Sequence, residues 1–244
     1  MDREIIKIMS KLILSDRPIR IKLLGDSITH GVGGTGFMQN GEPITKGFCR
    51  NPDGYCWAKQ FSEHCEKTYN CKVINNGCTG THIEFITENF DALVSDDDDI
   101  VICTIGTNNR NVVTNEKPAR EKVLHDVYHL IGELYGKFKE AEKDVIFVAN
   151  IPASAENEKI GTDGSMEYWR VLHMNDINDI YMKASADFGF PFVSMYNAFL
   201  EYCELGKIEI DSLLCDGLHP NDAGYDAMFS LIMRELGLGK IIKR

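Results

Sequence analysis

The sequence predicts a single α/β domain in which helices cover both faces of a mostly parallel sheet. Short β-rich runs recur along the chain, segments with helical periodicity separate them, and no repeat or low-complexity linker interrupts the alternation. A chain of 244 residues fits one domain. We therefore expect a three-layer α/β/α sandwich with a five-stranded parallel sheet over residues 1–244.

Five runs are rich in apolar and β-branched residues and are predicted as the strands. Segments with helical periodicity lie between them, as crossover helices of βαβ units require. The expected strands are 19–24, 72–75, 99–105, 144–150 and 191–195, and the expected helices are roughly 55–69, 82–89, 117–139, 166–188 and 221–236.

The clearest helix is 117–139, in which apolar residues recur on one third of the circumference. His125 and His129 are four residues apart on this helix, as in some zinc sites, but they lie opposite the apolar face and are expected to be solvated. The N-terminal segment 1–14 has an amphipathic rhythm, which predicts a surface helix or strand packed on the domain.

Composition excludes several classes of function. The net charge of −11 disfavours nucleic acid and anionic membranes as partners, and no apolar stretch is long enough for a membrane span. Asp2 and Glu4 interrupt the N-terminal segment, so a secretory signal is not expected and a cytoplasmic location is predicted. The cysteines are then reduced thiols, and without a CxxC pair no metal site is expected.

The segment 26–54, between the first strand and the next helix, is too long for an ordinary connection. It contains Gly31, Gly33 and Gly36 in a GxGxxG pattern, but neither the distance from the strand nor the following residues suit a nucleotide site. Residues 33–55 are predicted to form a lid-like insertion that shapes the pocket. The alternative is a flexible surface loop with no role in the site.

Four polar, glycine-bearing segments follow predicted strands or precede the last helix: GDSIT at 25–29, NNGCTGT at 75–81, IGTNN at 105–109 and DGLHPN at 216–221. Parallel strands place such segments at one edge of the sheet, where ligands bind. Acyl transfer needs a nucleophile, a base, an orienting acid and oxyanion donors. Ser27, His219 and Asp216 supply the first three, although a turn serine and a helix-capping Asp are the simpler interpretations of each segment alone.

In order and spacing these four segments resemble the sequence blocks of the SGNH/GDSL hydrolases. The resemblance spans residues 24–221 and implies a flavodoxin-like fold. It implies that Ser27 is the nucleophile and that Asp216 and His219 are its acid–base pair. The oxyanion donors would be the backbone N–H groups of Ser27 and Gly80 and the side-chain amide of Asn108.

The sequence departs from the family pattern beside the predicted oxyanion donors. Asn109 stands where many relatives have Asp, and Cys78 and Thr79 stand where Ser is frequent. These positions support the oxyanion loop more than its donors, so they affect the rate rather than the presence of activity. Asp26, Asn109 and Arg50 are further predicted to contact substrate.

The predicted activity is hydrolysis of a carboxylic ester without cofactor or metal. A small acyl group on a sugar is favoured, because the polar, glycine-rich insertion lacks the apolar run that a fatty chain requires. The alternatives are an O-acyltransferase, in which a second alcohol replaces water, and a catalytically silent carbohydrate-binding module on the same fold. The oligomeric state does not follow from the sequence.

Overall fold

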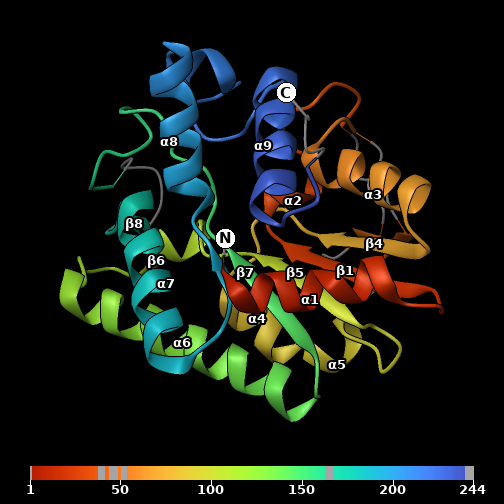
Figure 1. The fold of residues 1–244 in the computed structure, drawn as a ribbon. Coiled ribbons are helices and arrows are strands. Elements are labelled where there is room, and N and C mark those ends of the chain that lie inside the picture. The colour runs from red at the N-terminus through yellow and green to blue at the C-terminus, as the bar shows by residue number, and fades with distance from the viewer. Residues whose placement is uncertain (1, 38–41, 44–48, 51–53, 163–167, 240–244) are drawn as a thin grey trace.

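The central feature of the computed structural model is a single five-stranded parallel sheet (Figure 1). The structure describes residues 2–37, 42–43, 49–50, 54–162 and 168–239. The strands are β1 (Ile19–Gly25), β4 (Cys71–Gly77), β5 (Ile100–Thr104), β7 (Asp144–Val148) and β9 (Phe192–Val193). They correspond to the five predicted runs, and the predicted three-layer α/β/α class is confirmed.

The strand order β4-β1-β5-β7-β9 places the first strand in the interior of the sheet. Strand β1 pairs with β4 on one side and with β5 on the other, so the chain changes direction across the sheet at this strand. The register aligns Gly25 with Gly77 and with Thr104, which brings three carboxyl ends level with one another. Such a switch point is where open α/β sheets bind ligands.

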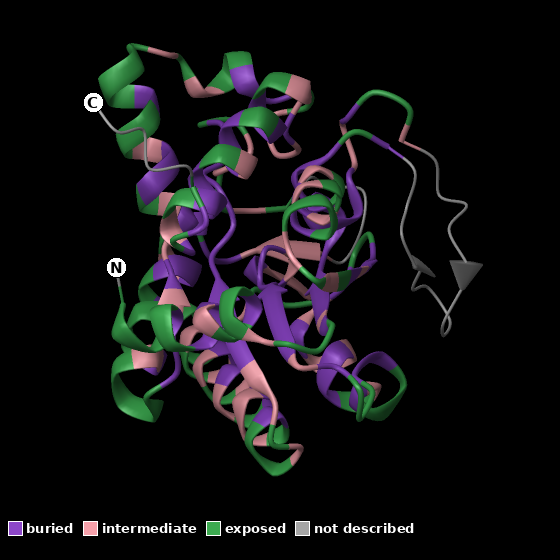
Figure 2. Ribbon diagram, turned by 45° about the vertical axis from the view of Figure 1, so that its right-hand side comes forward, coloured by how far each residue is buried: buried purple, intermediate pink, exposed green. Residues whose placement is uncertain are grey.

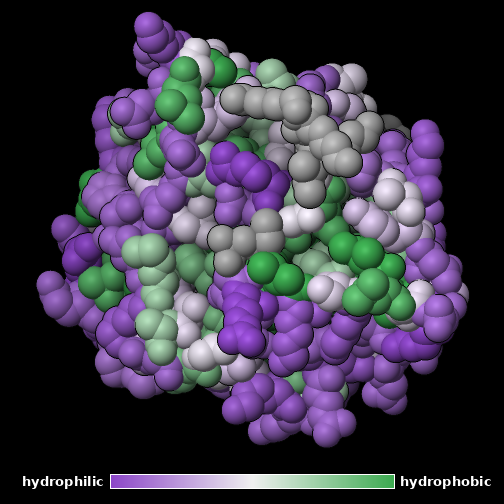
Figure 3. All heavy atoms as spheres, in the orientation of Figure 1, coloured by the Kyte–Doolittle hydropathy of each residue, from purple (hydrophilic) through white to green (hydrophobic). Residues whose placement is uncertain are grey.

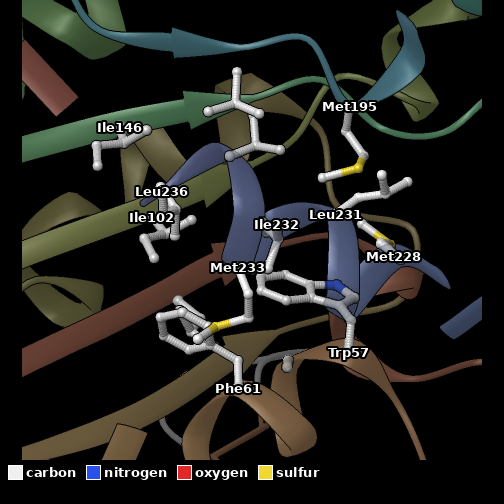
Figure 4. Close-up of a cluster of buried hydrophobic side chains, with 14 of the residues drawn as sticks. Trp57, Phe61, Ile102, Ile146, Met195, Met228, Leu231, Ile232, Met233 and Leu236 are labelled. Carbon is white, nitrogen blue, oxygen red and sulfur yellow. The ribbon is translucent and has the colours of Figure 1, made fainter. Parts of the chain in front are cut away.

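One face of the sheet is covered by α1 (Arg3–Leu14), α3 (Trp57–Thr68), α8 (Met195–Gly206) and α9 (Asp222–Glu235). Figure 4 shows Trp57 and Phe61 of α3 facing Ile232 and Met233 of α9. All four side chains are buried, and their apolar area holds the two helices together.

The opposite face is covered by α4 (Ile83–Glu88), α5 (Phe90–Leu93), α6 (Arg120–Glu140) and α7 (Met174–Phe188). Val123, Val127, Ile131, Leu134 and Phe138 of α6 are buried, as the predicted apolar face requires. Figure 2 shows the buried strands at the centre of the molecule and the exposed residues on the outer sides of the helices.

The N-terminal segment is a helix, one of the two forms expected of it. Asp2 caps α1 by accepting the N–H of Glu4. Four apolar residues of the helix, Ile5, Ile8, Met9 and Leu12, are buried against the sheet. This spacing is that of one helical face, so burial and periodicity agree.

The structure differs from the predicted elements in two places. The expected helix 166–188 begins only at Met174, and Tyr168–Arg170 forms strand β8, which pairs with β6 (Asn111–Val113). Helix α8 was not predicted, and the strand before it is shorter than expected, Phe192–Val193 instead of 191–195. The conformation of Tyr168–Arg170 depends on its pairing with β6, which lies more than fifty residues away in the sequence.

The surface in Figure 3 is mostly hydrophilic, with smaller hydrophobic areas between the polar side chains. None of the helices in the described part of the chain is long and apolar enough to cross a bilayer. His125 and His129 are exposed on α6, as predicted. Among the described residues, no group of three or more His, Cys, Asp or Glu side chains is placed to hold a metal ion.

Candidate active site

Ser27, the predicted nucleophile, is the first residue of the short helix α2 (Ser27–His30) at the carboxyl end of β1. Asp26 precedes it as the N-cap and accepts the N–H of Ile28 at 3.0 Å. A side chain at Gly25 would meet the carbonyl of Thr104 and the hydroxyl of Thr29 at less than 3.0 Å. Glycine is therefore required at this position because the neighbouring segments approach the backbone too closely for a side chain.

The segment 214–220 forms a closed loop before α9. Leu214 and Pro220 make an isolated β-bridge, and the N–H of Cys215 bonds to the carbonyl of His219 at 2.9 Å. One oxygen of Asp216 accepts the N–H groups of Leu218 and His219, at 3.0 and 2.8 Å. Asp216 is thus held in place by the backbone of the loop that carries the histidine.

Ser27, His219 and Asp216 lie in a continuous hydrogen-bonded chain. Nε2 of His219 is 2.8 Å from Oγ of Ser27, and Nδ1 of His219 is 2.7 Å from Oδ2 of Asp216. Partial burial acts to raise the pKa of Asp216, but the backbone and side chain of His219 outweigh it and leave the pKa below its ordinary value. Asp216 is therefore an anion at neutral pH, suited to orient the imidazole.

The loop after β4 carries Gly80, one of the predicted oxyanion donors. The N–H of Cys78 bonds to the carbonyl of Gly25 at 2.9 Å, which fixes this loop beside the Ser27 turn. Gly80 has φ of +80°, a left-handed conformation that glycine adopts without strain. The side-chain amide of Asn108 donates to the carbonyl of Thr81 at 2.8 Å, so the two predicted donor segments are bonded to each other.

Asp26 and Asn109, predicted to contact substrate, are instead buried and bonded to protein groups. Asp26 is 0% exposed, and its second oxygen accepts the amide of Asn150 at 2.9 Å. Asn109 accepts the N–H of Ile83 at 3.1 Å and donates to Glu84 at 2.8 Å, which anchors the start of α4. Both side chains are thus used in hydrogen bonds that hold neighbouring segments of the chain together.

The insertion 33–55 lies partly outside the described residues. Its two ends are attached to α9: Thr35 bonds to the carboxylate of Asp222 through both its N–H and its hydroxyl, each at 2.7 Å. The hydroxyl of Tyr55 donates to Asp226, and this bond raises the pKa of Tyr55 to about 12. Arg50 belongs to the strand β3 (Cys49–Arg50), which pairs with β2 (Glu42–Pro43), and its side chain is among the parts not described.

Two supporting residues were missed by the sequence analysis. Asn150, just beyond β7, donates through one amide to both Asp26 and Thr107. Ser154 donates its backbone N–H to the carbonyl of Gly217 at 2.8 Å, which holds the histidine loop against the segment after β7. Asn150 is the last residue of a predicted strand. Because ligands bind at the carboxyl ends of parallel strands, its position could have marked it as a candidate site residue.

The sheet order, the serine turn and the histidine loop together define the SGNH class of ester hydrolases. The model of the GDSL-like lipase/acylhydrolase family matches residues 23–227, and the chain belongs to this family. The predicted class of enzyme, an ester hydrolase, is thereby confirmed. No curated protein matches the sequence significantly.

Several solved structures share the fold. Axe2, an acetylxylan esterase from Geobacillus stearothermophilus, superposes with a TM-score of 0.66 at 18% identity, covering 93% of this chain and 98% of its own. LAE5, an α/β hydrolase from the metagenome of Lake Arreo in Spain, gives 0.66 at 19% identity, covering 92% and 97%. A two-domain esterase active on acetylated mannans, co-crystallised with mannopentaose, gives 0.61 at 22% identity, covering 95% and 52%.

Proposed function

We propose that the protein hydrolyses a carboxylic ester of a carbohydrate by two-step acyl transfer through Ser27. The observation that carries the proposal is the hydrogen-bonded chain from Oγ of Ser27 through His219 to Asp216. This is the arrangement in which an imidazole accepts the hydroxyl proton while a carboxylate fixes its tautomer.

In the first step the Ser27 hydroxyl attacks the ester carbonyl, and its proton moves to Nε2 of His219. The resulting oxyanion accepts hydrogen bonds from the N–H groups of Ser27 and Gly80 and from the amide of Asn108. Helix α2 begins at Ser27, so the N–H of Ser27 has no partner within the helix. His219 then returns the proton to the leaving alcohol, and water releases the acid by the same route.

A carbohydrate ester is the substrate class that the comparisons favour. Axe2 is an acetylxylan esterase and the two-domain esterase acts on acetylated mannans, and both share the fold at low identity. The sequence of the insertion beside Ser27 is polar and rich in glycine, which suits a small acyl group better than a long fatty chain.

The mechanism is tested with p-nitrophenyl acetate and a fluorophosphonate probe. We expect Ser27→Ala to abolish phosphonate labelling and to lower kcat by about 10³-fold or more, because the nucleophile is removed. Ser10→Ala, on α1 where the hydroxyl bonds only to the carbonyl of Ile6, is the matched control and should keep full activity. Full activity in Ser27→Ala would refute the mechanism.

The substrate class is tested with acetylated xylo- and manno-oligosaccharides against p-nitrophenyl esters of increasing chain length. We expect acetate release from the sugars with a kcat/KM at least tenfold above that for an octanoyl ester. Product analysis with added sugar acceptors separates hydrolysis from O-acyl transfer. Preference for the octanoyl ester would contradict the carbohydrate assignment while leaving the ester-hydrolase mechanism intact.

A further inference from the structure

His30 is a buried histidine at the end of α2, three residues after Ser27. Its ring nitrogen Nδ1 accepts the backbone N–H of Thr79 at 3.3 Å, and the hydroxyl of Thr79 lies 3.0 Å from the same nitrogen. Thr79 directly precedes Gly80, whose N–H is a predicted oxyanion donor. His30 therefore connects the helix that begins with Ser27 to the loop that carries this donor.

The loop is anchored on both sides of Gly80. Before it, Thr79 bonds to His30, and after it the carbonyl of Thr81 accepts the side-chain amide of Asn108 at 2.8 Å. A side chain at Gly80 would meet no described atom within 4 Å, so hydrogen bonds rather than packing hold this residue. The Gly80 N–H belongs to the planar peptide group that joins Thr79 to Gly80, so a shift of Thr79 turns this donor.

The bond from Thr79 determines which nitrogen of the His30 ring carries the proton. A backbone N–H can only donate, so Nδ1 must be unprotonated and the neutral ring must carry its proton on Nε2. Burial lowers the pKa of His30, which favours this neutral form. A protonated ring would carry a hydrogen on Nδ1 and could not accept the N–H of Thr79.

Packing alone does not explain a histidine at this position. The ring of His30 lies edge-on against Phe37 of the insertion, with ring centroids 5.0 Å apart and the planes at 79°. Within the described part of the chain, its Nε2 is buried without a hydrogen-bond partner, which costs stability. A phenylalanine would fill the same space without this cost, so the contact made by Nδ1 is what distinguishes the histidine.

We propose that His30 is a positioning residue for the reaction: through Nδ1 it holds Thr79 so that the N–H of Gly80 points at the oxyanion. In this role His30 touches neither the substrate nor the reacting atoms. Negative charge arises on the carbonyl oxygen when Ser27 attacks, and a donor stabilises it most when it is oriented beforehand. The inference rests on the proposed function.

The test compares His30→Phe with His30→Asn on p-nitrophenyl acetate. His30→Phe keeps a ring and removes the acceptor, whereas His30→Asn loses the ring but keeps an oxygen acceptor near the position of Nδ1. We expect kcat to fall about tenfold or more in His30→Phe, with KM changed less than about threefold, because the donor acts on the transition state. In His30→Asn, kcat should stay within about threefold of the wild type. A role in packing alone predicts the opposite order of rates.

The matched control is His64→Phe. His64 of α3 also lies edge-on against a phenylalanine, Phe229 of α9, with ring centroids 6.0 Å apart. This ring pair belongs to the contact between two helices and not to the oxyanion loop, so the replacement should leave kcat and KM unchanged. Circular dichroism checks that each variant is folded.

Nitrogen-15 NMR of the histidine rings tests the same contact in the wild-type protein, without turnover. The chemical shifts should identify His30 as the Nε2–H tautomer, with its signals assigned as those missing from the spectrum of either variant. An Nδ1–H tautomer would overturn this inference alone. In an active protein, equal rates in the two His30 variants or a faster His30→Phe would do the same. A wild-type protein that neither cleaves esters nor reacts with a phosphonate would overturn the proposed function.

Discussion

Ser27 lies on a short turn that presents two groups used in the proposed mechanism. Asp26 accepts the N–H of Ile28, while the N–H of Ser27 keeps no partner within α2 and remains available for an oxyanion. The same short turn therefore presents both a hydroxyl and a donor. His219 reaches the hydroxyl because its own loop is closed by the bridge between Leu214 and Pro220.

The amide of Asn108 provides a test of the oxyanion assignment. One of its two N–H groups is used on the carbonyl of Thr81, and we propose that the other contacts the oxyanion. Asn108→Ala is then expected to lower kcat by about 10²–10³-fold with little change in KM, measured on p-nitrophenyl acetate. Asn175→Ala, on the exposed surface of α7, serves as the control. A loss below tenfold in Asn108→Ala would argue against the assignment.

Predictability at the residue scale depends on whether a role is local. Asp216 and His219 lie three residues apart, and Gly80 and Asn108 follow strand ends. Spacing together with the family resemblance was enough to name them as candidates. The bonding of Asp26 was not predictable in the same way. Its partners Asn150 and Thr107 are determined by which strands lie beside β1, and the spacing of residues along one chain does not give that order.

At the scale of elements, the strands with continuous apolar runs were predicted, whereas strand β8 and helix α8 were not. Strands β1 and β5 are buried along nearly their whole length, and such strands leave continuous apolar runs. The sequence pattern predicts the start of a helix at the residues that form strand β8. Their conformation depends instead on pairing with β6, more than fifty residues away. Tertiary pairing outweighed local pattern there.

Helix α6 carries a prediction about stability. Phe138 is 0% exposed and packs edge-on against Phe90 and Phe147, with ring centroids 4.9 and 6.0 Å apart. We expect Phe138→Ala to lower the free energy of unfolding by about 3–5 kcal/mol, because it leaves a cavity in the core. Urea denaturation measures the change. Phe188→Ala, at a site 38% exposed, should cost clearly less, and equal losses would contradict the packing described for α6.

At the scale of the whole molecule, the alternation of strands and helices was enough to predict the layers of the fold. The order of the strands in the sheet could be predicted only from the family resemblance, because hydrophobic periodicity does not show which strands are neighbours. The insertion 33–55 was predicted from its length alone, and its attachment to α9 through Asp222 and Asp226 was not. Such contacts join polar side chains that have no special pattern in the sequence.

The stability of the whole protein should depend on pH through Asp26. Since burial raises its pKa, the folded state binds the proton more tightly than the unfolded state, so this group's contribution to stability falls as pH rises above about 4. Asp26→Asn lacks this dependence. The Tm of the variant minus that of the wild type should therefore increase from pH 4 to pH 7 in calorimetry. A difference that stays constant or decreases would contradict a raised pKa.

The two groups that exchange a proton in the proposed mechanism, at positions 27 and 219, are 192 residues apart in the chain. During synthesis the serine emerges almost two hundred residues before the histidine that the proposed mechanism pairs with it. If a chain is cut between these positions, the proposed mechanism predicts that each piece alone is inactive. Ester cleavage would then report that both pieces have reassociated, which makes this protein suited to a split-enzyme assay of its own assembly.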